Sequence, residues 1–408
     1  MYYICHARKL NPMTRNLIYK AFALTLIITS LSVTVNAQFN DSLSLTGGLN
    51  ALRVAVPFLT IAPDSRAGAM GDVGAASTPD VNSQHWNPAK YAFIDKEWGI
   101  SLSYTPWLRK LVNDINLNYV SGYYRLDKEQ VISASLLYFS MGDITFTDIN
   151  NVQQSHHNPN EFSFDVAYSR LFSDKISGGL AFRYIRSDLT GGFSQQGQTA
   201  AKAGNAVAAD VAMYYQSPIS IDSRKGEMAF GLNVSNIGTK LSYNEEKKDF
   251  IPINMRLGGR VSLDFDAYNR MSFMLDANKL LVPTPPIYDR NDETVIIAGK
   301  DPDVSVPAGM LQSFYDAPDG FKEELHEISY SLGVEYWYAN QFAIRAGYYT
   351  EHETKGNRKY FTLGAGLRYN IFNLDFAYLV PSSGQNNPMA NTVRFSLAFD
   401  FETQRKGR

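Results

Sequence analysis

Polar and apolar residues alternate along most of the chain after residue 98. Between residues 161 and 169, Phe162, Phe164 and Val166 occupy every second position, and Ser163 and Asp165 lie between them. Successive side chains of a β-strand point to opposite faces, so this pattern predicts strands with one apolar and one polar face. Fourteen such segments follow one another: 99–108, 113–126, 129–149, 161–173, 175–189, 205–217, 226–238, 253–265, 270–282, 327–339, 341–349, 359–372, 373–379 and 391–402.

The length of these segments separates two kinds of all-β protein. Strands of soluble sandwiches typically have about 5 to 6 residues, whereas a tilted strand that crosses a membrane needs about 9 to 11. Most of the segments reach the longer value, their number is even, and several carry aromatic clusters such as Tyr336-Trp337-Tyr338. The pattern therefore predicts an all-β fold: a 14-stranded antiparallel transmembrane β-barrel in the outer membrane.

The gaps between the segments alternate between short and long, as expected when short turns face the periplasm and long loops face outward. Gaps such as 172–175 and 338–341 read as tight turns, and 218–225 reads as a somewhat longer one. The other set includes 150–160, 190–204 and the 44-residue segment 283–326. With an even number of strands, both ends of the barrel chain lie on the periplasmic side.

The first 37 residues have the features of a secretory signal peptide. Basic residues precede an apolar run at 21–33, and Val35-Asn36-Ala37 offers a cleavage site with small residues. An uncleaved anchor helix is the alternative, but the run is shorter than the ~20 residues that a span needs. Met13 is a second possible start, because residues 1–12 only lengthen the basic region.

Composition narrows the possible functions. The chain has a formal net charge of −2 and no basic patch, so we expect no nucleic-acid partner. The only cysteine, Cys5, lies in the predicted signal peptide, so the mature protein would have no disulfide. We expect three mature parts: an N-terminal hatch or plug segment in the lumen (38–98), the barrel (99–402) and a C-terminal tail (403–408).

The segment 38–98 differs from the strands because it is rich in glycine and small residues and is interrupted by prolines. A segment of this size can fill the lumen of a barrel. Within it, Trp86, Asn87, Pro88 and Ala89 are the residues we expect to fix the hatch.

The segment 283–326 is too long to be a simple connection. It combines acidic residues with apolar ones, which predicts either docking against a partner or folding into the lumen; a disordered acidic loop is the alternative. The expected partner-binding residues are Asp289, Ile296, Ile297, Met310, Leu311, Phe314 and Tyr315, with the loop 190–204 as a second surface.

Catalytic and metal-binding patterns are weak. No Gly-x-Ser-x-Gly motif is present, and the adjacent His156 and His157 have no partner at metal-ligand spacing. The acidic residues between 289 and 303 lack the spacing of a calcium loop. Inward charges suit a polar lumen in which they pair with one another and contact water, which needs no catalytic role; they are Asp165, Asp210, Asp276, Glu335, Arg368 and Arg394. We expect no enzyme activity, no metal site and no cofactor.

Three runs near the N-terminus resemble known outer-membrane proteins: PDSRAGAMGD (63–72), SQHWNPAKYAF (83–93) and SYTPWLRKLVND (103–114). The Asn-Pro-Ala tripeptide is similar to the hatch of the FadL-like superfamily of long-chain fatty-acid transporters, which are 14-stranded barrels. All three runs resemble more closely the PorV family of the type IX secretion system. The resemblance is dense over 56–126 and afterwards includes GLNVSNIG (231–238), but the tail 403–408 departs from the usual terminal phenylalanine that serves as an assembly signal.

The PorV resemblance implies a non-enzymatic component of protein secretion. Such a barrel associates with the SprA/Sov translocon, receives secreted cargo proteins through their C-terminal signal domain and hands them to the PorU attachment complex, in contact with outer-membrane lipid. The alternative is a FadL-like transporter of hydrophobic small molecules, which would need an apolar pocket from the outer loops to the hatch. A lipid A or phospholipid hydrolase is a third class, for which no nucleophile and base can be nominated.

Overall fold

The chain divides into two compact units, residues 1–44 and 45–408, and everything described below belongs to the second. The computed structural model describes residues 49–402 apart from 109–113, 148–152, 193–201, 245–247, 290, 293 and 383–391. The predicted signal peptide, the start of the predicted hatch and the tail 403–408 lie outside the described residues.

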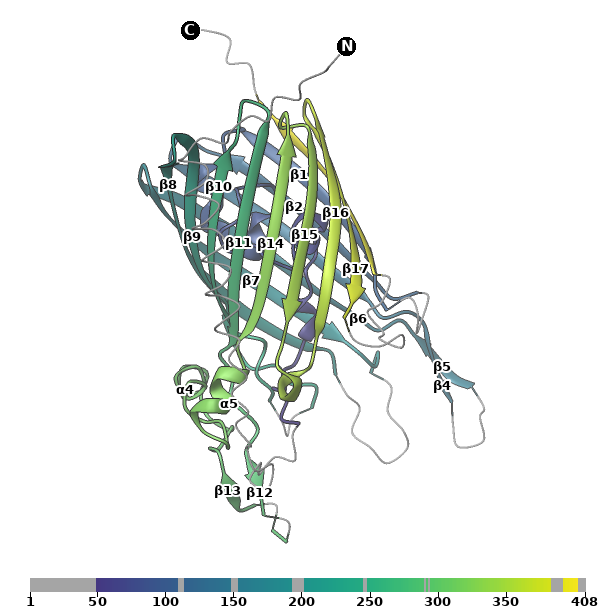
Figure 1. The fold of residues 1–408 in the computed structure, drawn as a ribbon. Coiled ribbons are helices and arrows are strands. Elements are labelled where there is room, and N and C mark those ends of the chain that lie inside the picture. The colour runs from purple at the N-terminus through teal and green to yellow at the C-terminus, as the bar shows by residue number, and fades with distance from the viewer. Residues whose placement is uncertain are drawn as a thin grey trace, which may run out of the picture. The chain divides into compact units, whose positions relative to one another are not determined.

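Fourteen strands of the described chain close into an antiparallel barrel (Figure 1), which confirms the predicted fold. Each barrel strand pairs with the barrel strands before and after it in the chain, and β1 pairs with β18 to close the ring. The barrel strands are β1 (Trp98–Pro106), β2 (Asn116–Arg125), β3 (Gln130–Ser140), β6 (Asn160–Ser173), β7 (Ile176–Asp188), β8 (Gly204–Ile221), β9 (Arg224–Gly238), β10 (Asn254–Asp264), β11 (Asn269–Leu280), β14 (Ser329–Tyr338), β15 (Phe342–Thr350), β16 (Lys359–Tyr369), β17 (Phe372–Pro381) and β18 (Val393–Phe401).

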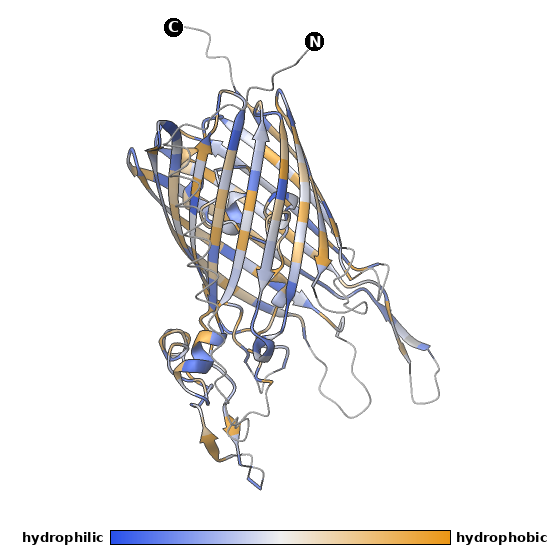
Figure 2. Ribbon diagram, viewed as in Figure 1, coloured by the Kyte–Doolittle hydropathy of each residue, from blue (hydrophilic) through white to orange (hydrophobic). Residues whose placement is uncertain are grey.

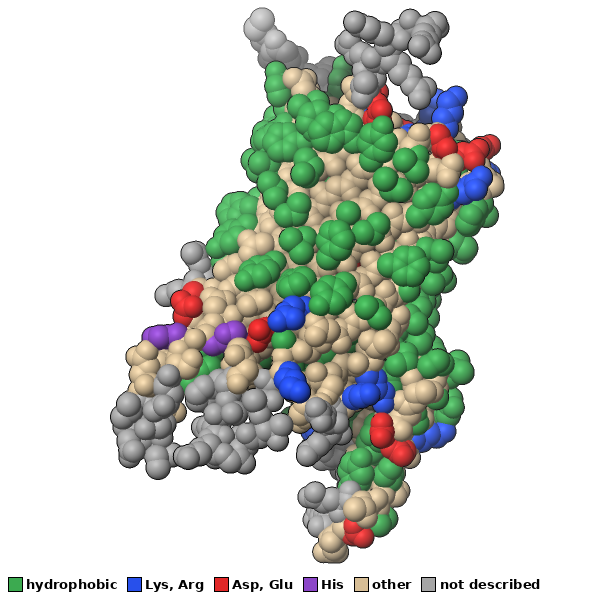
Figure 3. Space-filling model, turned by 180° about the vertical axis from the view of Figure 1, so that it is seen from behind, with side chains coloured by type: hydrophobic (Ala, Val, Ile, Leu, Met, Phe, Trp, Pro, Cys, Tyr) green, Lys and Arg blue, Asp and Glu red, His purple; other side chains and the backbone are tan. Residues whose placement is uncertain are grey.

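The predicted alternation gives the wall its two faces. In β6, Phe164, Val166 and Tyr168 are exposed on the outside, whereas Asp165 and Ser169 are buried inside. Hydropathy alternates in the same way along the strands (Figure 2), and hydrophobic side chains cover much of the outer wall (Figure 3). An apolar exterior with a polar interior is the arrangement that a barrel in lipid requires. In the described residues, no helix is long and apolar enough to cross a membrane.

Two predicted boundaries were wrong for local reasons. The predicted strand 129–149 ends at Ser140, because Gly142 adopts a positive φ of 81° and the chain turns into a separate hairpin. That hairpin consists of β4 (Ile144–Thr147) and β5 (Gln153–His157). The predicted longer turn at 218–225 is a two-residue turn, since Asp222 and Ser223 have the positive φ values that tight hairpins favour.

The hatch, residues 49–97 of the described chain, runs through the lumen and forms only short helical turns: η2 (Pro57–Thr60), α2 (Ser65–Gly68), α3 (Ser83–Trp86) and η3 (Pro88–Phe93). It appears as the purple segment inside the barrel in Figure 1. Its first part contributes Val56, Phe58 and Leu59 to the largest apolar core, together with Leu117, Ile185 and other residues at the long-loop end. The hatch is therefore packed inside the wall.

The long loop after β11 is an ordered structure, which we call the rim module (residues 281–328). It contains a small two-stranded sheet, β12 (Ile287–Tyr288) with β13 (Ile296–Ala298), and two short helices, α4 (Val306–Gln312) and α5 (Phe321–His326). Figure 1 shows it projecting beyond the ends of the strands. The disordered-loop alternative does not hold for the described part of this segment.

Candidate functional site: the hatch and the rim module

The tetrapeptide Trp86–Ala89 fastens the hatch to four consecutive strands. Each of its residues exchanges one hydrogen bond with a different strand: Asn233 Nδ2 of β9 donates to Trp86 O (3.0 Å), Asn87 Nδ2 donates to Met213 O of β8 (3.0 Å), Ser169 Oγ of β6 donates to Pro88 O (2.7 Å), and Ser177 Oγ of β7 donates to Ala89 O (2.6 Å). All four residues of the tetrapeptide are almost fully buried. These bonds place the tetrapeptide between the hatch and the wall, and its role in fixing the hatch stays a prediction.

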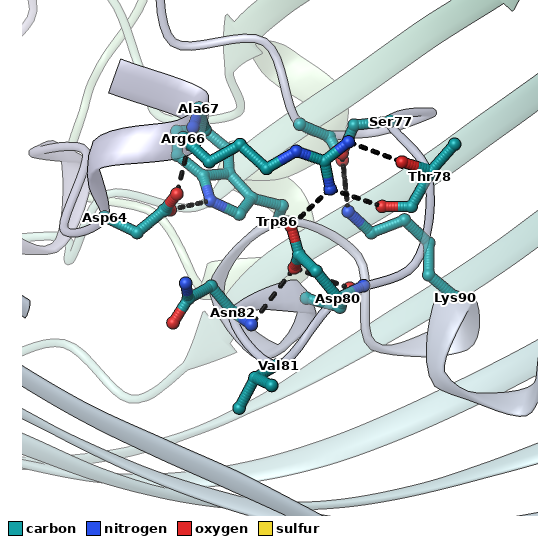
Figure 4. Close-up of polar contacts among 12 residues, drawn as sticks. Asp64, Arg66, Ala67, Ser77, Thr78, Asp80, Val81, Asn82, Trp86 and Lys90 are labelled. Carbon is teal, nitrogen blue, oxygen red and sulfur yellow. Dashed lines mark hydrogen bonds and ion pairs between the residues drawn. The ribbon is translucent and has the colours of Figure 1, made fainter. Parts of the chain in front are cut away.

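A buried arginine fastens the hatch to a second part of the wall. Arg66 donates two hydrogen bonds to Glu335 of β14, from Nε to Oε1 (3.0 Å) and from Nη2 to Oε2 (2.9 Å). Its Nη1 reaches Asp80 Oδ2 (2.7 Å) within the hatch (Figure 4). Arg345 of β15 also pairs with Glu335 (2.8 Å) and continues to Asp375 of β17 (2.6 Å). Bidentate arginine–carboxylate pairs are among the stronger and more directional contacts, so this network fixes the position of the hatch.

The hatch also holds its own shape by buried hydrogen bonds (Figure 4). Asp64 accepts from Trp86 Nε1 (2.6 Å) and from the backbone N–H of Ala67 (2.9 Å). Lys90 is fully buried and donates from Nζ to Gly74 O and Ser77 Oγ, both at 2.9 Å. These bonds tie residues 64 to 90 into one unit.

Glycines on the inner wall allow the hatch to approach the strands closely. A Cβ at Gly231 would lie 1.9 Å from Ala75 O, and one at Gly347 would lie 2.0 Å from the carbonyl carbon of Met70. At the same level, Asp276 of β11 accepts hydrogen bonds from the backbone N–H groups of Gly74 (2.7 Å) and Ala75 (2.8 Å). At these positions the backbone of the hatch itself contacts the wall.

The expected pairing of inward charges is found for Asp165 and Asp210, which both bind Arg183. It is also found for Glu335 and for Arg394, which pairs with Asp72 of the hatch (3.2 Å). Two of these charges form no ion pair among the described residues: Asp276 accepts hydrogen bonds from the hatch backbone, and Arg368 donates from Nε to Asn373 Oδ1 (2.8 Å).

A second cluster of buried charges attaches the rim module to the barrel. We call it the rim clasp; it consists of Lys279, Glu323, Glu324, Glu327 and Lys355. Lys279 of β11 pairs with Glu324 (3.0 Å) and Glu327 (2.6 Å), and Lys355 pairs with Glu323 (2.6 Å) and Glu327 (3.0 Å). Because all five side chains are buried, removing one partner would leave another charge uncompensated.

The rim clasp also connects to neighbouring polar groups. Asn50 at the start of the described hatch donates from Nδ2 to Glu323 Oε1 (3.0 Å), and Thr284 Oγ1 donates to Glu327 (2.6 Å). Glu324 accepts from the backbone N–H groups of Asp316 (2.7 Å) and Ala317 (2.9 Å). One cluster therefore joins the rim module, the wall and the hatch.

Two carboxyl groups at or beside the rim clasp, Asp316 and Glu323, have shifted pKa values. Burial raises the pKa of Asp316 to about 6, a hydrogen bond from the backbone N–H of Thr284 acts against this, and the neighbouring Glu324 and Glu327 add to the rise. Burial would also raise the pKa of Glu323, but the hydrogen bond and charge of Lys355 outweigh it and lower that pKa. The folded module therefore favours the protonated form of Asp316 and the ionised form of Glu323.

The predicted partner-binding residues of the rim module fall into two groups. Ile297, Leu311, Phe314 and Tyr315 are exposed, by 45% to 68% of their surface, and the neighbouring Phe321 and Leu325 join them at 75% and 49%. We call these six residues the apolar rim patch.

The remaining predicted partner-binding residues have structural contacts within the chain. Met310 packs against the core that contains Phe250, and Ile296 is half-buried in β13. Asp289 accepts a hydrogen bond from the backbone N–H of Asn291 (2.7 Å). Most of the second predicted surface, residues 193–201 of the loop 190–204, lies outside the described residues.

The sequence reasoning did not identify Arg66, the inner-wall glycines or the rim clasp. Arg66 stood within a quoted motif without a role, and Glu323 and Glu324 were not among the acidic residues singled out. Glycines at inward-facing strand positions were a usable signal, since glycine in a strand often marks close approach of another backbone.

A family model of the type IX secretion system protein PorV matches residues 46–287. Comparison with curated proteins gave no match. Among solved structures, the monoaromatic hydrocarbon channel CymD has a TM-score of 0.46 and 12% identity, covering 84% of this chain and 99% of that one.

Two further solved structures have a similar degree of likeness. A FadL homologue of Pseudomonas aeruginosa has a TM-score of 0.41 and 11% identity, covering 86% of this chain and 100% of that one. The Pseudomonas putida toluene transporter TodX has a TM-score of 0.41 and 12% identity, covering 81% of this chain and 95% of that one.

The family match spans more than half of the chain and includes the hatch motif, so the chain belongs to the PorV family of type IX secretion system proteins and is an outer-membrane β-barrel.

Proposed function

We propose that this protein is a non-enzymatic cargo-handling component of the type IX secretion system. In this role it binds the SprA/Sov translocon barrel, receives cargo proteins by their C-terminal signal domain and hands them to the PorU attachment complex. The observation that carries the proposal is the apolar rim patch, displayed on an ordered module that the rim clasp holds to the barrel.

Exposed apolar residues on a projecting element mark a surface that becomes covered by another molecule. The patch includes three aromatic side chains of the kind enriched at protein interfaces, Phe314, Tyr315 and Phe321. A module fixed before binding loses little conformational entropy when a partner docks. The rim patch therefore suits capture of a protein domain.

The alternative, transport of hydrophobic small molecules through the lumen, receives less support. Such a route requires the hatch to move, and the hatch is held by hydrogen bonds to several strands of the wall, including β8 and β14. Cargo handling at the rim needs no movement of this kind.

Site-directed photo-crosslinking in cells tests the proposed surface. A photoreactive phenylalanine analogue at Phe314 should crosslink to the translocon or to cargo. The same analogue at Tyr268, an exposed residue in the turn between β10 and β11 at the opposite end of the barrel, should not. Crosslinks from neither position, or equal crosslinks from both, would contradict the assignment of the rim patch.

A second experiment replaces exposed residues of the apolar rim patch, because substitution disturbs the rim module less than deletion of residues 289–314 would. Leu311→Ser with Phe314→Ser should reduce cargo capture at least tenfold, because both side chains are exposed and their loss leaves the core intact. Deleting residues 289–314 would also remove Met310 from the core. The matched control, Asp301→Ala with Asp319→Ala, changes two exposed polar residues of the same module and should capture cargo normally.

A further inference from the structure

A cavity of about 340 Å³ lies between the hatch and the long-loop end of the barrel. Its wall includes His85 and Trp86 of the hatch, Arg256 and Asn254 of β10, and Asn278 of β11. The volume is at the small end of the range for ligand pockets. Neither the cargo-handling role nor the hatch contacts account for two of the groups that face it, Arg256 and His85.

Arg256 has an unusual environment for a lumen arginine. Its Nε donates to Asn278 Oδ1 (2.6 Å), and its guanidinium lies over the Trp86 ring at 4.5 Å from the centroid. Within the described part of the chain, no carboxylate lies within 4.0 Å of it, and its two Nη atoms have no hydrogen-bond acceptor. They remain accessible from the cavity.

The other cations that line this cavity are all paired. Arg183 binds Asp165 and Asp210, Lys355 belongs to the rim clasp, and Arg358 binds Glu351. Arg256 is therefore the lining cation that lacks a carboxylate among the described residues.

Besides Asp210, which binds Arg183, the carboxylates that act on Arg256 from farther away are Asp276 and Asp72, and both are already engaged. Asp72 pairs with Arg394 and accepts a hydrogen bond from Tyr360 at 2.5 Å. Asp276 accepts from two backbone N–H groups of the hatch. Neither is placed to neutralise the free edge of the guanidinium.

A second donor faces the same cavity. The His85 ring packs edge-on against Trp86, with centroids 4.8 Å apart, and its nitrogens make no hydrogen bond with any described residue. Even a neutral imidazole has one N–H to donate. Arg256 and His85 thus both contact the Trp86 ring and both line the cavity, and each has an unused donor.

We infer that this cavity binds a small anion through a carboxylate or phosphate group, with the Nη atoms of Arg256 as the principal donors and His85 as a second donor. A charge held inside a barrel without a partner is costly, and a bound anion would remove that cost. The planar guanidinium matches both groups in a bidentate geometry. Leu52, Leu59 and Leu280 also line the cavity and can receive a short apolar part of the ligand.

Calorimetric titration of the full-length protein in detergent tests this inference with two probes, inorganic phosphate and butyrate. The inference expects saturable 1:1 binding of at least one probe, and the preferred probe identifies the head group. Arg256→Met should weaken binding at least tenfold, and His85→Phe, which keeps a ring against Trp86, should weaken it by a smaller factor. Binding of neither probe, or binding unchanged in Arg256→Met, overturns the inference.

Arg368→Met is the matched control. Arg368 also lies over a tryptophan, Trp337, at 4.8 Å and donates to an asparagine, but it lines the cavity on the other side of the hatch. Its loss should leave binding unchanged, and an equal loss in both variants overturns the inference. If Arg256→Met fails to fold, Leu280→Phe retains the arginine and fills the cavity; it should abolish binding, and unchanged binding overturns the inference.

Discussion

Single glycines on the inner wall decide how closely the hatch lies against the strands. Gly231 of β9 faces Ala75 O, whereas Gly259 of β10 faces outward toward the Phe230 ring. Any side chain larger than hydrogen at the first position would occupy the space of the hatch backbone. The same change at the second position meets only a side chain, 3.6 Å away.

Gly231→Ala should destabilise the seated hatch. Its Cβ would lie 1.9 Å from Ala75 O, so the hatch or the strand must shift, and overpacking of this kind costs about 1–3 kcal/mol. Limited trypsin digestion should then cleave after Lys90, which is buried in the native protein. Gly259→Ala is the control and should stay protected; equal protection of both variants would contradict the close-approach argument.

The rim module shows how a long loop becomes an ordered element. Its helices have six or seven residues each and would not be stable alone. The rim clasp and the contact of Met310 with the core hold them in place. This attachment makes the stability of the module depend on pH through its buried carboxyl groups.

Asp316→Asn should stabilise the rim module at pH 7.5. The folded-state pKa of Asp316 is about 6, above the ordinary value of 3.8, so the folded module favours the protonated form. Its unfavourable contribution is therefore complete above pH 6 and fades as the pH falls from 6 toward 4.

Hydrogen exchange of residues 306–326 measures this effect. Protection at pH 7.5 should be about a hundredfold higher in Asp316→Asn than in the wild type, because the pKa of Asp316 rises from 3.8 to about 6 and each pKa unit corresponds to about a tenfold change. The two proteins should converge near pH 4, where the wild-type carboxyl group is protonated in the folded module and largely protonated in the unfolded one. A difference that persists unchanged at about pH 4 would show that Asp316 acts by another route.

Sequence patterns predicted the elements well where the physical cause was local. Alternating residues such as Phe164 and Asp165 face the outside and the lumen in turn, so β6 was correctly assigned. The end of β3 depended on Gly142 adopting a positive φ beside Asp114, which alternation does not reveal. The rim clasp joins Lys279 to Glu324 across 45 residues, and only the folded chain brings such partners together.

The molecule as a whole combines a fixed hatch with a projecting rim. Hydrogen bonds or ion pairs connect the hatch to strands around the wall, including β2, β3, β6, β14 and β18. Such a barrel suits a scaffold that holds the rim module at the membrane surface. Its lumen should conduct ions only when the hatch is loosened.

Arg66→Met should loosen the hatch and allow ion leakage. It breaks the buried pair with Glu335, which costs about 3 kcal/mol, the lower end of the range for such pairs, because Arg345 still neutralises Glu335. In planar bilayers the wild type should stay closed, and the variant should show intermittent conductance.

Lys96→Met provides the control for this experiment. It removes an exposed pair with Glu402, for which a loss of about 0–1 kcal/mol is expected, and it should stay closed. A stable open pore in the wild type would contradict the account of a fixed hatch.

The most direct test of the cargo-handling role is affinity purification of the tagged protein from outer membranes in mild detergent, followed by mass spectrometry. The proposed function predicts that a very large translocon barrel and exported proteins sharing a C-terminal domain accompany it. Recovery of a solitary barrel that carries a bound fatty acid or another apolar ligand would contradict that role and favour transport of small molecules.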